Sequence, residues 1–320
     1  MRFDVIALGE LLIDFTESGM SPQGNPLFEA NPGGAPCNVL AMLQKLGRKT
    51  AFLGKVGKDA FGASLRKTCE DAGICMEQLT VDPDHHTTLA FVQTAGNGDR
   101  SFSFCRNPGA DQMLAPEDIS EEFIADAGIF HFGSLSLTHE PSRSATKKAV
   151  EIAGANGVTI SFDPNLRPPL WDRPESARAQ IVWGLSQSQI VKIADDELLF
   201  LTGETDFDQG AAILRERFPN IRLLCVTAGA SGSTGYFEDL HVFEPGLTLG
   251  GTIETTGAGD TFCGCVLDYV LSHGLEKLSE AQLHEMLRFA NTAAYLVTTK
   301  KGAIRSMPDP AAVQAILATL

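Results

Sequence analysis

Residues 254–262 read Glu-Thr-Thr-Gly-Ala-Gly-Asp-Thr-Phe, and the interpretation of the whole chain starts from this stretch. Glycine and alanine leave the backbone free to turn several N–H groups toward one point. The residues that follow have helical spacing, and the N-terminus of a helix attracts anions. Asp260 would stand beside such an anion site, where its carboxylate can accept the proton of an attacking hydroxyl group.

A glycine-rich turn before a helix also has a purely structural explanation, because an aspartate at that position can cap the helix. A bare Gly-x-Gly-Asp string would favour this explanation. The longer string Thr-Thr-Gly-Ala-Gly-Asp-x-Phe is more specific, and it favours a role for Asp260 in catalysis.

Other phosphate-binding motifs do not occur in the sequence. There is no Gly-x-x-x-x-Gly-Lys-Ser/Thr string, which excludes a P-loop enzyme. The glycines at 229, 232 and 235 lack Gly-x-Gly-x-x-Gly spacing, and the residues after them are strand-like rather than helical. A dinucleotide-binding oxidoreductase is therefore disfavoured.

Around the glycine turn, short apolar runs alternate with helical patterns along most of the chain. This alternation predicts a parallel sheet covered by helices on both faces, which is a three-layer α/β/α fold. The expected strands are 5–9, 51–56, 129–132, 158–163, 190–193 and 222–227, and the expected helices are 38–46, 61–72, 142–155, 208–218, 260–272 and 281–299.

Two segments interrupt this alternation. Residues 13–31 have few periodic apolar positions, and residues 87–106 read as a hairpin around the turn-forming pair Asn97-Gly98. We expect them to form a small β-sheet lid outside the main sheet. Since no linker or repeat is apparent, residues 1–320 are predicted to form a single domain.

Composition limits the partners that the protein can have. The net charge of −15 makes nucleic acid and anionic membrane surfaces poor partners. The seven cysteines show no spacing suited to zinc, and the N-terminal residues lack the apolar stretch of a signal peptide. We therefore expect free thiols and a cytoplasmic protein.

The glycine turn resembles the C-terminal signature of the ribokinase-like (PfkB) sugar kinases. A second signature of that family occurs at residues 33–39, which read Gly-Gly-Ala-Pro-Cys-Asn-Val. The resemblance covers essentially the whole chain. It implies ATP-dependent phosphorylation of a sugar hydroxyl group, with Asp260 as the catalytic base and the backbone of Gly257, Ala258 and Gly259 as the anion hole.

The sugar should bind at the opposite side of this turn. Asp14 follows the first strand, and ligands of open parallel sheets bind beyond the carboxyl ends of the strands. Gly33 and Gly34 would let the backbone approach a sugar ring, and Asn38 can both donate and accept hydrogen bonds. The resemblance assigns Asp14, Gly34 and Asn38 to sugar contact.

Two further segments are candidates for substrate contact. The string Asp-Pro-Asn-Leu-Arg at residues 163–167 follows a strand, and the resemblance implies that Asn165 and Arg167 lie near the substrate or phosphates. A strand-end turn with a surface arginine is the alternative explanation. Arg106 ends the predicted hairpin, and we expect it to reach the cleft.

The substrate is suggested by four strings together. Residues 9–15, 106–111, 132–135 and 163–167, with Trp171, are most similar to the fructokinase branch of the family. The alternative is 2-keto-3-deoxygluconate kinase, in which Arg106 or Arg167 would bind the carboxylate. A non-catalytic regulator is disfavoured because Asp260 and the anion hole are intact.

The resemblance also implies where nucleotide and metal ions bind. Residues 226–232 resemble the family's Val-Thr-x-Gly-x-x-Gly string, and Mg²⁺ is expected because phosphoryl transfer requires charge neutralisation. The family's Asn-x-x-Glu motif has Ala194 in place of Asn, which leaves a phosphate effect open. The implied ATP-binding residues are Thr227, Gly229, Gly232 and Asn291; Glu197 would act on Mg²⁺ through water, and Glu254 with Gly302 and Ser306 would form a site for K⁺.

A lid of this kind exposes apolar side chains. We expect Phe91, Phe102 and Phe104 to form its apolar face and to pair with a second subunit. A homodimer formed through the lid is therefore predicted.

Overall fold

The computed structural model describes the backbone of residues 2–94 and 100–319 and the side chains of residues 2–92 and 103–319. A nine-stranded sheet forms its centre, in the order β13-β12-β11-β10-β9-β8-β1-β4-β5. The strands from β11 to β5 in this order run parallel, and β12 and β13 add an antiparallel edge. The bounds are β1 Phe3–Leu8, β4 Thr50–Gly57, β5 Cys75–Asp82, β8 Ala127–Gly133, β9 Thr159–Asp163, β10 Ile190–Ala194, β11 Leu223–Thr227, β12 Gly232–Phe237 and β13 Leu240–Pro245.

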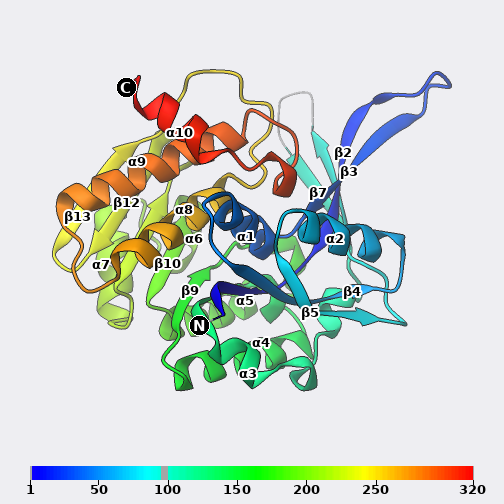
Figure 1. The fold of residues 1–320 in the computed structure, drawn as a ribbon, viewed down its shortest axis with the longest axis horizontal. Coiled ribbons are helices and arrows are strands. Elements are labelled where there is room, and N and C mark those ends of the chain that lie inside the picture. Colours follow the sequence, from blue (N-terminus) through cyan, green and yellow to red (C-terminus); the bar gives the residue numbers. More distant parts are fainter. Residues whose placement is uncertain (1, 95–99, 320) are drawn as a thin grey trace.

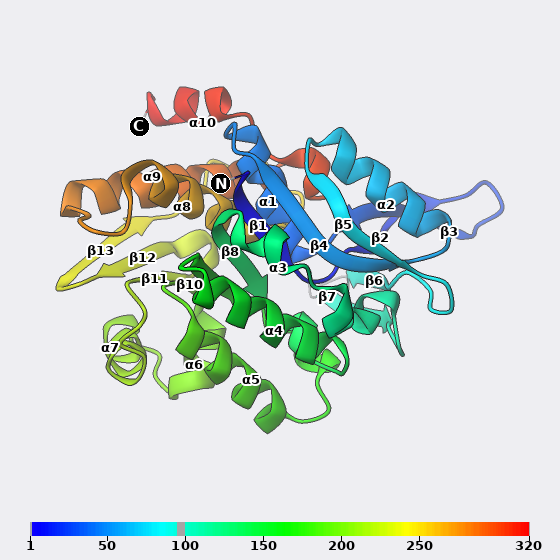
Figure 2. The same ribbon diagram turned by 60° about the horizontal axis from the view of Figure 1, so that its bottom comes forward.

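Helices cover both faces of this sheet, as Figures 1 and 2 show. One layer contains α1 (Ala35–Lys45), α2 (Ala60–Asp71), α8 (Ala258–His273), α9 (Glu280–Val297) and α10 (Pro310–Leu317). The other contains α3 (Glu121–Ala125), α4 (Ser142–Ala155), α5 (Pro174–Gln187), α6 (Asp195–Thr202) and α7 (Phe207–Arg217).

Strand β1 shows why two helical layers are needed. Val5 and Ala7 pack into one hydrophobic cluster, whereas Ile6 and Leu8 pack into the other. Because successive side chains of a strand point to opposite faces, a wholly apolar strand must be covered twice. The predicted three-layer α/β/α fold is confirmed.

A separate four-stranded sheet projects beyond the central one, in the order β3-β2-β6-β7 (Figure 1). Its strands are β2 (Leu12–Met20), β3 (Pro26–Gly33), β6 (Leu89–Thr94) and β7 (Arg100–Cys105). They coincide with the two segments that interrupt the sequence pattern. The turn predicted at Asn97 and Gly98 lies outside the described residues.

The two faces of this small sheet have different neighbours. Phe91 stacks on Phe15 with ring centroids 5.0 Å apart, and the edge of Phe15 meets Phe61 of α2. Phe104 pairs with Ala90 in register, one position from the pair formed by Phe91, and therefore points to the opposite face. The expectation that Phe91 and Phe104 share one apolar face was wrong, and the side chain of Phe102 lies outside the described residues.

Two general properties follow from the described part of the chain. None of its helices has the length and apolar composition needed to cross a membrane. All seven cysteines are free, and five of them are buried.

Candidate active site

The glycine turn leads directly into α8. Gly257 has φ +78°, and a Cβ atom built on it would lie 2.7 Å from the Cβ of Ala303. Only glycine fits both this backbone conformation and this contact. The first turn of α8 follows, and its backbone N–H groups have no carbonyl partners within the helix. The N–H of Ala258 donates to the carbonyl of Thr255 at 3.3 Å, and the anion hole at this turn stays a prediction.

Asp260 lies in that first turn and is half-buried. Its Oδ2 accepts a hydrogen bond of 2.7 Å from Nδ2 of Asn38, which α1 contributes. Burial raises the pKa of Asp260 to about 6; the Asn38 hydrogen bond and the charges of Lys192 and Arg167 oppose this rise, and the charge of Asp163 adds to it. A carboxylate with this pKa is ionised at neutral pH and still basic enough to accept a proton.

Lys192, on β10, is a site residue that the sequence reasoning missed. Its buried Nζ lies 3.1 Å from Oδ2 of Asp163, and a Cβ built on Gly259 would lie 3.1 Å from the same Nζ. Burial alone would lower the pKa of Lys192, but the carboxylates of Asp163, Glu197 and Asp260 raise it above its ordinary value. A fixed positive charge therefore stands beside the anion hole.

A cavity of about 330 Å³ opens between the small sheet and the central sheet at this point. Val92 and Phe104 come from the small sheet, and Leu135 and Lys192 come from the central domain. The cavity gathers most of the residues predicted for sugar binding and catalysis, together with Glu197, which was predicted to act on Mg²⁺: Asp14, Gly34, Asn38, Asn165, Arg167, Glu197, Gly257, Gly259 and Asp260.

Asp14, on β2, lines the same cavity as Asp260. Burial raises the pKa of Asp14 to about 7; the charge of Arg167 opposes the rise, and the charges of Glu254 and Asp260 add to it. A Cβ built on Gly33 would lie 2.5 Å from Oδ2 of Asp14, so Gly33 acts by making room for this carboxylate. Gly33 does not itself line the cavity.

The chain around Gly34 is held by a second residue that sequence reasoning did not single out. Glu10 is buried, and its Oε1 accepts a hydrogen bond of 2.8 Å from the backbone N–H of Ala35 at the start of α1. Burial raises the pKa of Glu10 to about 7, against the backbone hydrogen bonds that favour its charged form. A glutamate directly after the apolar strand β1 was the signal available in the sequence.

Asn38 has one free polar atom. Its Nδ2 is used by Asp260, whereas its Oδ1 is buried without a hydrogen-bond partner among the described residues. Buried polar atoms are rarely left unpaired, because the lost hydration is costly. A substrate hydroxyl group is the natural donor to this oxygen.

Arg106 is placed differently from the expectation. Its Nε and Nη2 contact Oδ2 of Asp111 at 2.8 and 2.7 Å, and its Nη1 donates to Thr138. Nη2 also donates to the carbonyl of Leu135, and the side chain does not line the sugar cavity. With every nitrogen already bound to protein, Arg106 anchors the end of β7 to the central domain.

A second cavity, of about 200 Å³, contains the residues predicted for ATP: Thr227, Gly229, Gly232 and Asn291. Thr255 and Gly259 line this cavity and the sugar cavity alike, so the two meet at the catalytic turn. Asn291 also has a structural role. Its Oδ1 accepts from Ser233 at 2.9 Å, and its Nδ2 donates to the carbonyl of Glu244 at 3.0 Å.

The candidate metal ligands are already engaged with the backbone. Glu197 accepts from the N–H groups of Leu166 and Ala194 at 2.6 and 2.8 Å. Burial raises its pKa, and the charge of Lys192 opposes that rise. Within the described residues, no three His, Cys, Asp or Glu side chains cluster as a metal site.

The residues predicted for a potassium ion do come together. Oε1 of Glu254 accepts from the N–H of Gly302 at 2.7 Å. A Cβ built on Gly302 would lie 3.9 Å from Oγ of Ser306. Ser306 and Glu254 are both buried.

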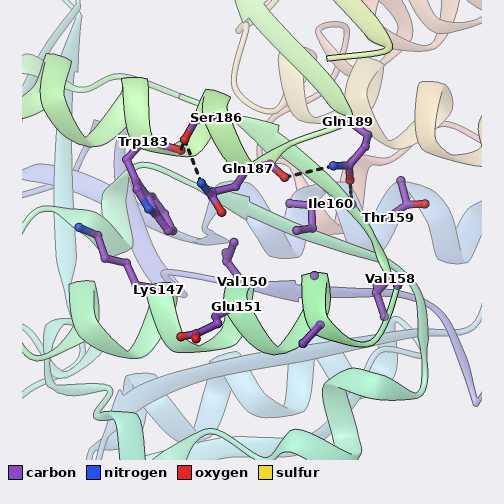
Figure 3. Close-up of a pocket in the computed structure, with 13 residues that line it drawn as sticks. Lys147, Val150, Glu151, Val158, Thr159, Ile160, Trp183, Ser186, Gln187 and Gln189 are labelled. Carbon is purple, nitrogen blue, oxygen red and sulfur yellow. Dashed lines mark hydrogen bonds between the residues drawn. The ribbon is translucent and has the colours of Figure 1, made fainter. Parts of the chain in front are cut away.

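A roomier groove lies at the other ends of the same strands, between α4 and α5. Figure 3 shows Lys147 beside Trp183, and the Lys147 Nζ is 5.1 Å from the centre of the indole ring. The groove borders the first residue of β9, whereas Asp163 at the end of β9 faces the active site. Its polar groups, including Gln187 and Gln189, bond mainly to each other and to the backbone.

Comparison with known proteins identifies the family of the chain. The family model of the pfkB family carbohydrate kinases matches residues 2–310. The chain is 42% identical to probable fructokinase-2 of Arabidopsis thaliana, with 95% of this chain and 92% of the relative covered. It is 41% identical to fructokinase-2 of Solanum lycopersicum, with 95% and 93% covered.

Solved structures give the same result. A fructokinase of Vibrio cholerae with fructose, ADP and calcium ion bound has a TM-score of 0.87 and 32% identity, over 99% of this chain and 100% of that one. A fructokinase of Xylella fastidiosa with bound ATP has a TM-score of 0.88 and 28% identity over the same shares. The chain belongs to the PfkB family of carbohydrate kinases.

Proposed function

We propose that the protein is an ATP-dependent fructokinase that transfers the γ-phosphoryl group of ATP to fructose and forms fructose 6-phosphate. One observation supports this most directly: the two cavities meet at Thr255 and Gly259, where the carboxylate of Asp260 stands. A sugar hydroxyl group in one cavity and a phosphoryl group in the other would meet at that carboxylate. Relatives at about 40% identity are named fructokinases.

Asp260 is the proposed catalytic base. It accepts the proton of the attacking hydroxyl group, and Asn38 holds its carboxylate in place through the 2.7 Å hydrogen bond. Since that bond uses Oδ2, Oδ1 is the oxygen that remains for the substrate. The free Oδ1 of Asn38 and the carboxylate of Asp14 would accept hydrogen bonds from other hydroxyl groups of the sugar.

Charge on the transferring group is stabilised from two sides. The backbone N–H groups at the start of α8 would stabilise it on one side, and Lys192 supplies a positive charge held by Asp163 on the other. The sequence has no P-loop lysine, and Lys192 lies five positions before Glu197, whose charge helps to raise the pKa of Lys192. Arg167, which lines the cavity, would add a second positive charge.

Mg²⁺ bound to ATP would neutralise charge on the β- and γ-phosphates. Because no cluster of acidic residues forms a metal cage in the described chain, the phosphates and water would provide most ligands. Glu197 would then hold a metal-bound water, since its carboxylate lines the cavity. Glu254 and Ser306 would border a monovalent cation beside the anion hole, as predicted for K⁺.

Fructose is preferred to 2-keto-3-deoxygluconate on electrostatic grounds. An acidic substrate needs a cation of its own, but Arg106 is occupied by Asp111, and Lys192, beside Gly259, would contact the phosphoryl group. Asp14 adds negative charge to the cavity. Only Arg167 would remain for a substrate carboxylate.

We also propose that the chain acts as one kinase domain whose small sheet is a lid, and that two copies pair through it. Met20 and Leu27 leave 64% and 45% of their surface exposed on β2 and β3, where a partner could cover them. The free cysteines suit a cytoplasmic location. Light scattering of the wild type and of M20E/L27E would test the dimer.

The function is tested by measuring ADP release with Mg-ATP and a panel of fructose, 2-keto-3-deoxygluconate, ribose, glucose, tagatose and adenosine. We expect strong turnover with fructose alone. Turnover with the keto acid would keep Asp260 and move the specificity to Arg167. Absence of turnover with every member would contradict the kinase proposal.

A further inference from the structure

A third cavity lies next to the sugar site, on the other side of Phe104. It has a volume of about 250 Å³ and lies between the end of β7 and the turn at Pro168–Leu170. Its walls include Phe104, Arg106, Asn107, Gln112, His139 and Trp171. None of the residues assigned above to fructose, ATP or metal ions lines it.

Two of the residues that line this cavity carry a buried polar atom without a hydrogen-bond partner. In the described part of the chain, five buried side-chain atoms have no hydrogen-bond partner. One is Oδ1 of Asn38, which lines the proposed sugar cavity. Two others, Nε1 of Trp171 and Nδ1 of His139, belong to residues that line this third cavity. Trp171 is only 9% exposed, so protein alone leaves its N–H donor unsatisfied.

The charge of the cavity indicates a neutral ligand. Arg106 is its only basic residue apart from His139, and both Nε and Nη2 of Arg106 contact the carboxylate of Asp111. The exposed carboxylate of Asp172 borders the cavity and would repel an anion. An anionic sugar phosphate or carboxylate would therefore be disfavoured here.

The shape and chemistry suit a small polyhydroxylated molecule. Trp171, Phe104 and Leu170 provide apolar surface for the C–H groups of such a ligand. Gln112 uses its Oε1 to accept from the N–H of Gly109 at 2.9 Å, which leaves its amide N–H groups as donors. Apolar walls with a few convergent polar groups are typical of small-molecule sites.

We propose that this cavity is a second saccharide site, which binds one neutral sugar or sugar alcohol through hydrogen bonds to Nε1 of Trp171 and Nδ1 of His139. Phe104 lines both this cavity and the sugar cavity, and Arg106 bonds to Leu135, which lines the sugar cavity as well. Occupancy of the second site would therefore restrain β7 and change the KM for fructose.

Tryptophan fluorescence offers a direct test, because the chain has two tryptophans. Trp183 lies in the groove between α4 and α5 (Figure 3), so W183F leaves Trp171 as the only reporter. The W183F protein, with and without D14N, is titrated with xylitol, D-sorbitol, D-glucose and D-fructose, and with D-gluconate as the anion. We expect a saturable change with at least one neutral probe, retained when D14N weakens the acceptor site.

Calorimetric titration of variants with the same probe then shows whether Trp171 and His139 contribute to binding. W171F keeps an aromatic ring and removes only the N–H, and H139F removes the second polar atom. Each should weaken binding roughly 3- to 10-fold, as loss of one hydrogen bond does, whereas W183F is the matched control and should not. Circular dichroism checks that W171F folds. If W171F does not fold, H139F provides the test instead.

Three results would overturn the proposal. One is the lack of any saturable signal up to about 100 mM of each neutral probe, a concentration well above the millimolar dissociation constant of a weak ligand. The second is loss of binding in D14N, which would assign the probe to the fructose site. The third is equal affinity in W171F, H139F and the control.

Discussion

Arg106 and Lys192 are both buried cations near the sugar cavity, but they differ in how many of their nitrogen donors the protein uses. At the end of the lid, Arg106 is paired with Asp111, and both side chains are 2% exposed. In the middle of β10, Lys192 is paired with Asp163, and the side chains are 9% and 4% exposed. Arg106 has an acceptor for every nitrogen, whereas Lys192 has Asp163 on one side and the anion hole on the other. A buried cation is available for chemistry only when its protein partners leave a donor unused.

The largest effect that follows from this comparison is a loss of stability when Arg106 is replaced. R106M would leave the carboxylate of Asp111 buried without its partner, which costs about 3–5 kcal/mol. Fructose turnover at a temperature where the variant is folded should stay within a few-fold of the wild type. Thermal or urea unfolding measures the first effect, and steady-state kinetics measures the second.

The double variant R106M/D111L is the control for R106M, because it removes both charges together. It should recover much of the lost stability. A loss of turnover in R106M at full folding would show that Arg106 acts on the substrate after all.

At Lys192 the effect should fall on catalysis. K192M removes the positive charge beside Gly259, and we expect kcat to decrease by about 10²-fold, as for the loss of one preorganised electrostatic contact. The KM for fructose should change less, because Lys192 acts on the phosphoryl group. Steady-state kinetics with both substrates varied measures this split. Normal kcat in a folded K192M protein would contradict the role given to Lys192.

A smaller effect is expected at Asp14, where the carboxylate proposed to bind the sugar lowers the stability of the ligand-free protein. The pKa of Asp14 is raised to about 7 in the folded protein, so the native state binds a proton more tightly than the unfolded state does. The stability tied to this group is complete below about pH 4 and is lost as the pH rises toward 7. D14N removes this cost, and it should stabilise the ligand-free protein at pH 8 by about 2 kcal/mol, allowing for solvent screening.

Thermal unfolding of wild type and D14N at pH 5 and pH 8 checks this prediction. The gain should be larger at pH 8, and fructose binding should be weakened. An equal gain at both pH values would mean that ionisation of Asp14 is not its origin.

The smallest predicted effect is a shift in pH dependence. Asp260, with a pKa of about 6, must be ionised to accept a proton, so kcat/KM should decrease below pH 6. The positive charge of Lys192 lowers this pKa, and its removal should move the acid limb of the profile to higher pH. R106M provides the matched control and should leave the limb in place. If the acid limb of the kcat/KM profile is unchanged in K192M, the charge of Lys192 does not influence the pKa of Asp260.

Much of the fold could be predicted because it depends on local patterns. The apolar run of β1 and the helical spacing of α4 are visible in the sequence alone. The predicted bounds of α4 are those observed, and those of β1 differ by one or two residues. The edge strand β5 was not predicted, since the consecutive polar residues Glu77 and Gln78 interrupt its alternation of apolar and polar positions. The helix α6 was also missed, because it is short and begins directly after β10.

The site was predictable where a motif specifies it and not where distant segments meet. Asn38 and Asp260 are 222 positions apart, and only the two family signatures pointed to both. Lys192 was missed because a lysine in an apolar strand has no motif of its own; its burial against Asp163 was the missing information. The setting of Arg106 depends on Asp111, whose side-chain direction no local pattern reveals.

The central claim is that Asp260 is the base that takes the proton of fructose. Its most direct test is the kinetics of D260N, with fructose binding measured separately by calorimetry. Asparagine keeps the size of the side chain and its contact with Asn38 but cannot accept a proton, so we predict a loss of kcat of at least about 10²-fold with fructose binding retained. Turnover close to that of the wild type would contradict the account.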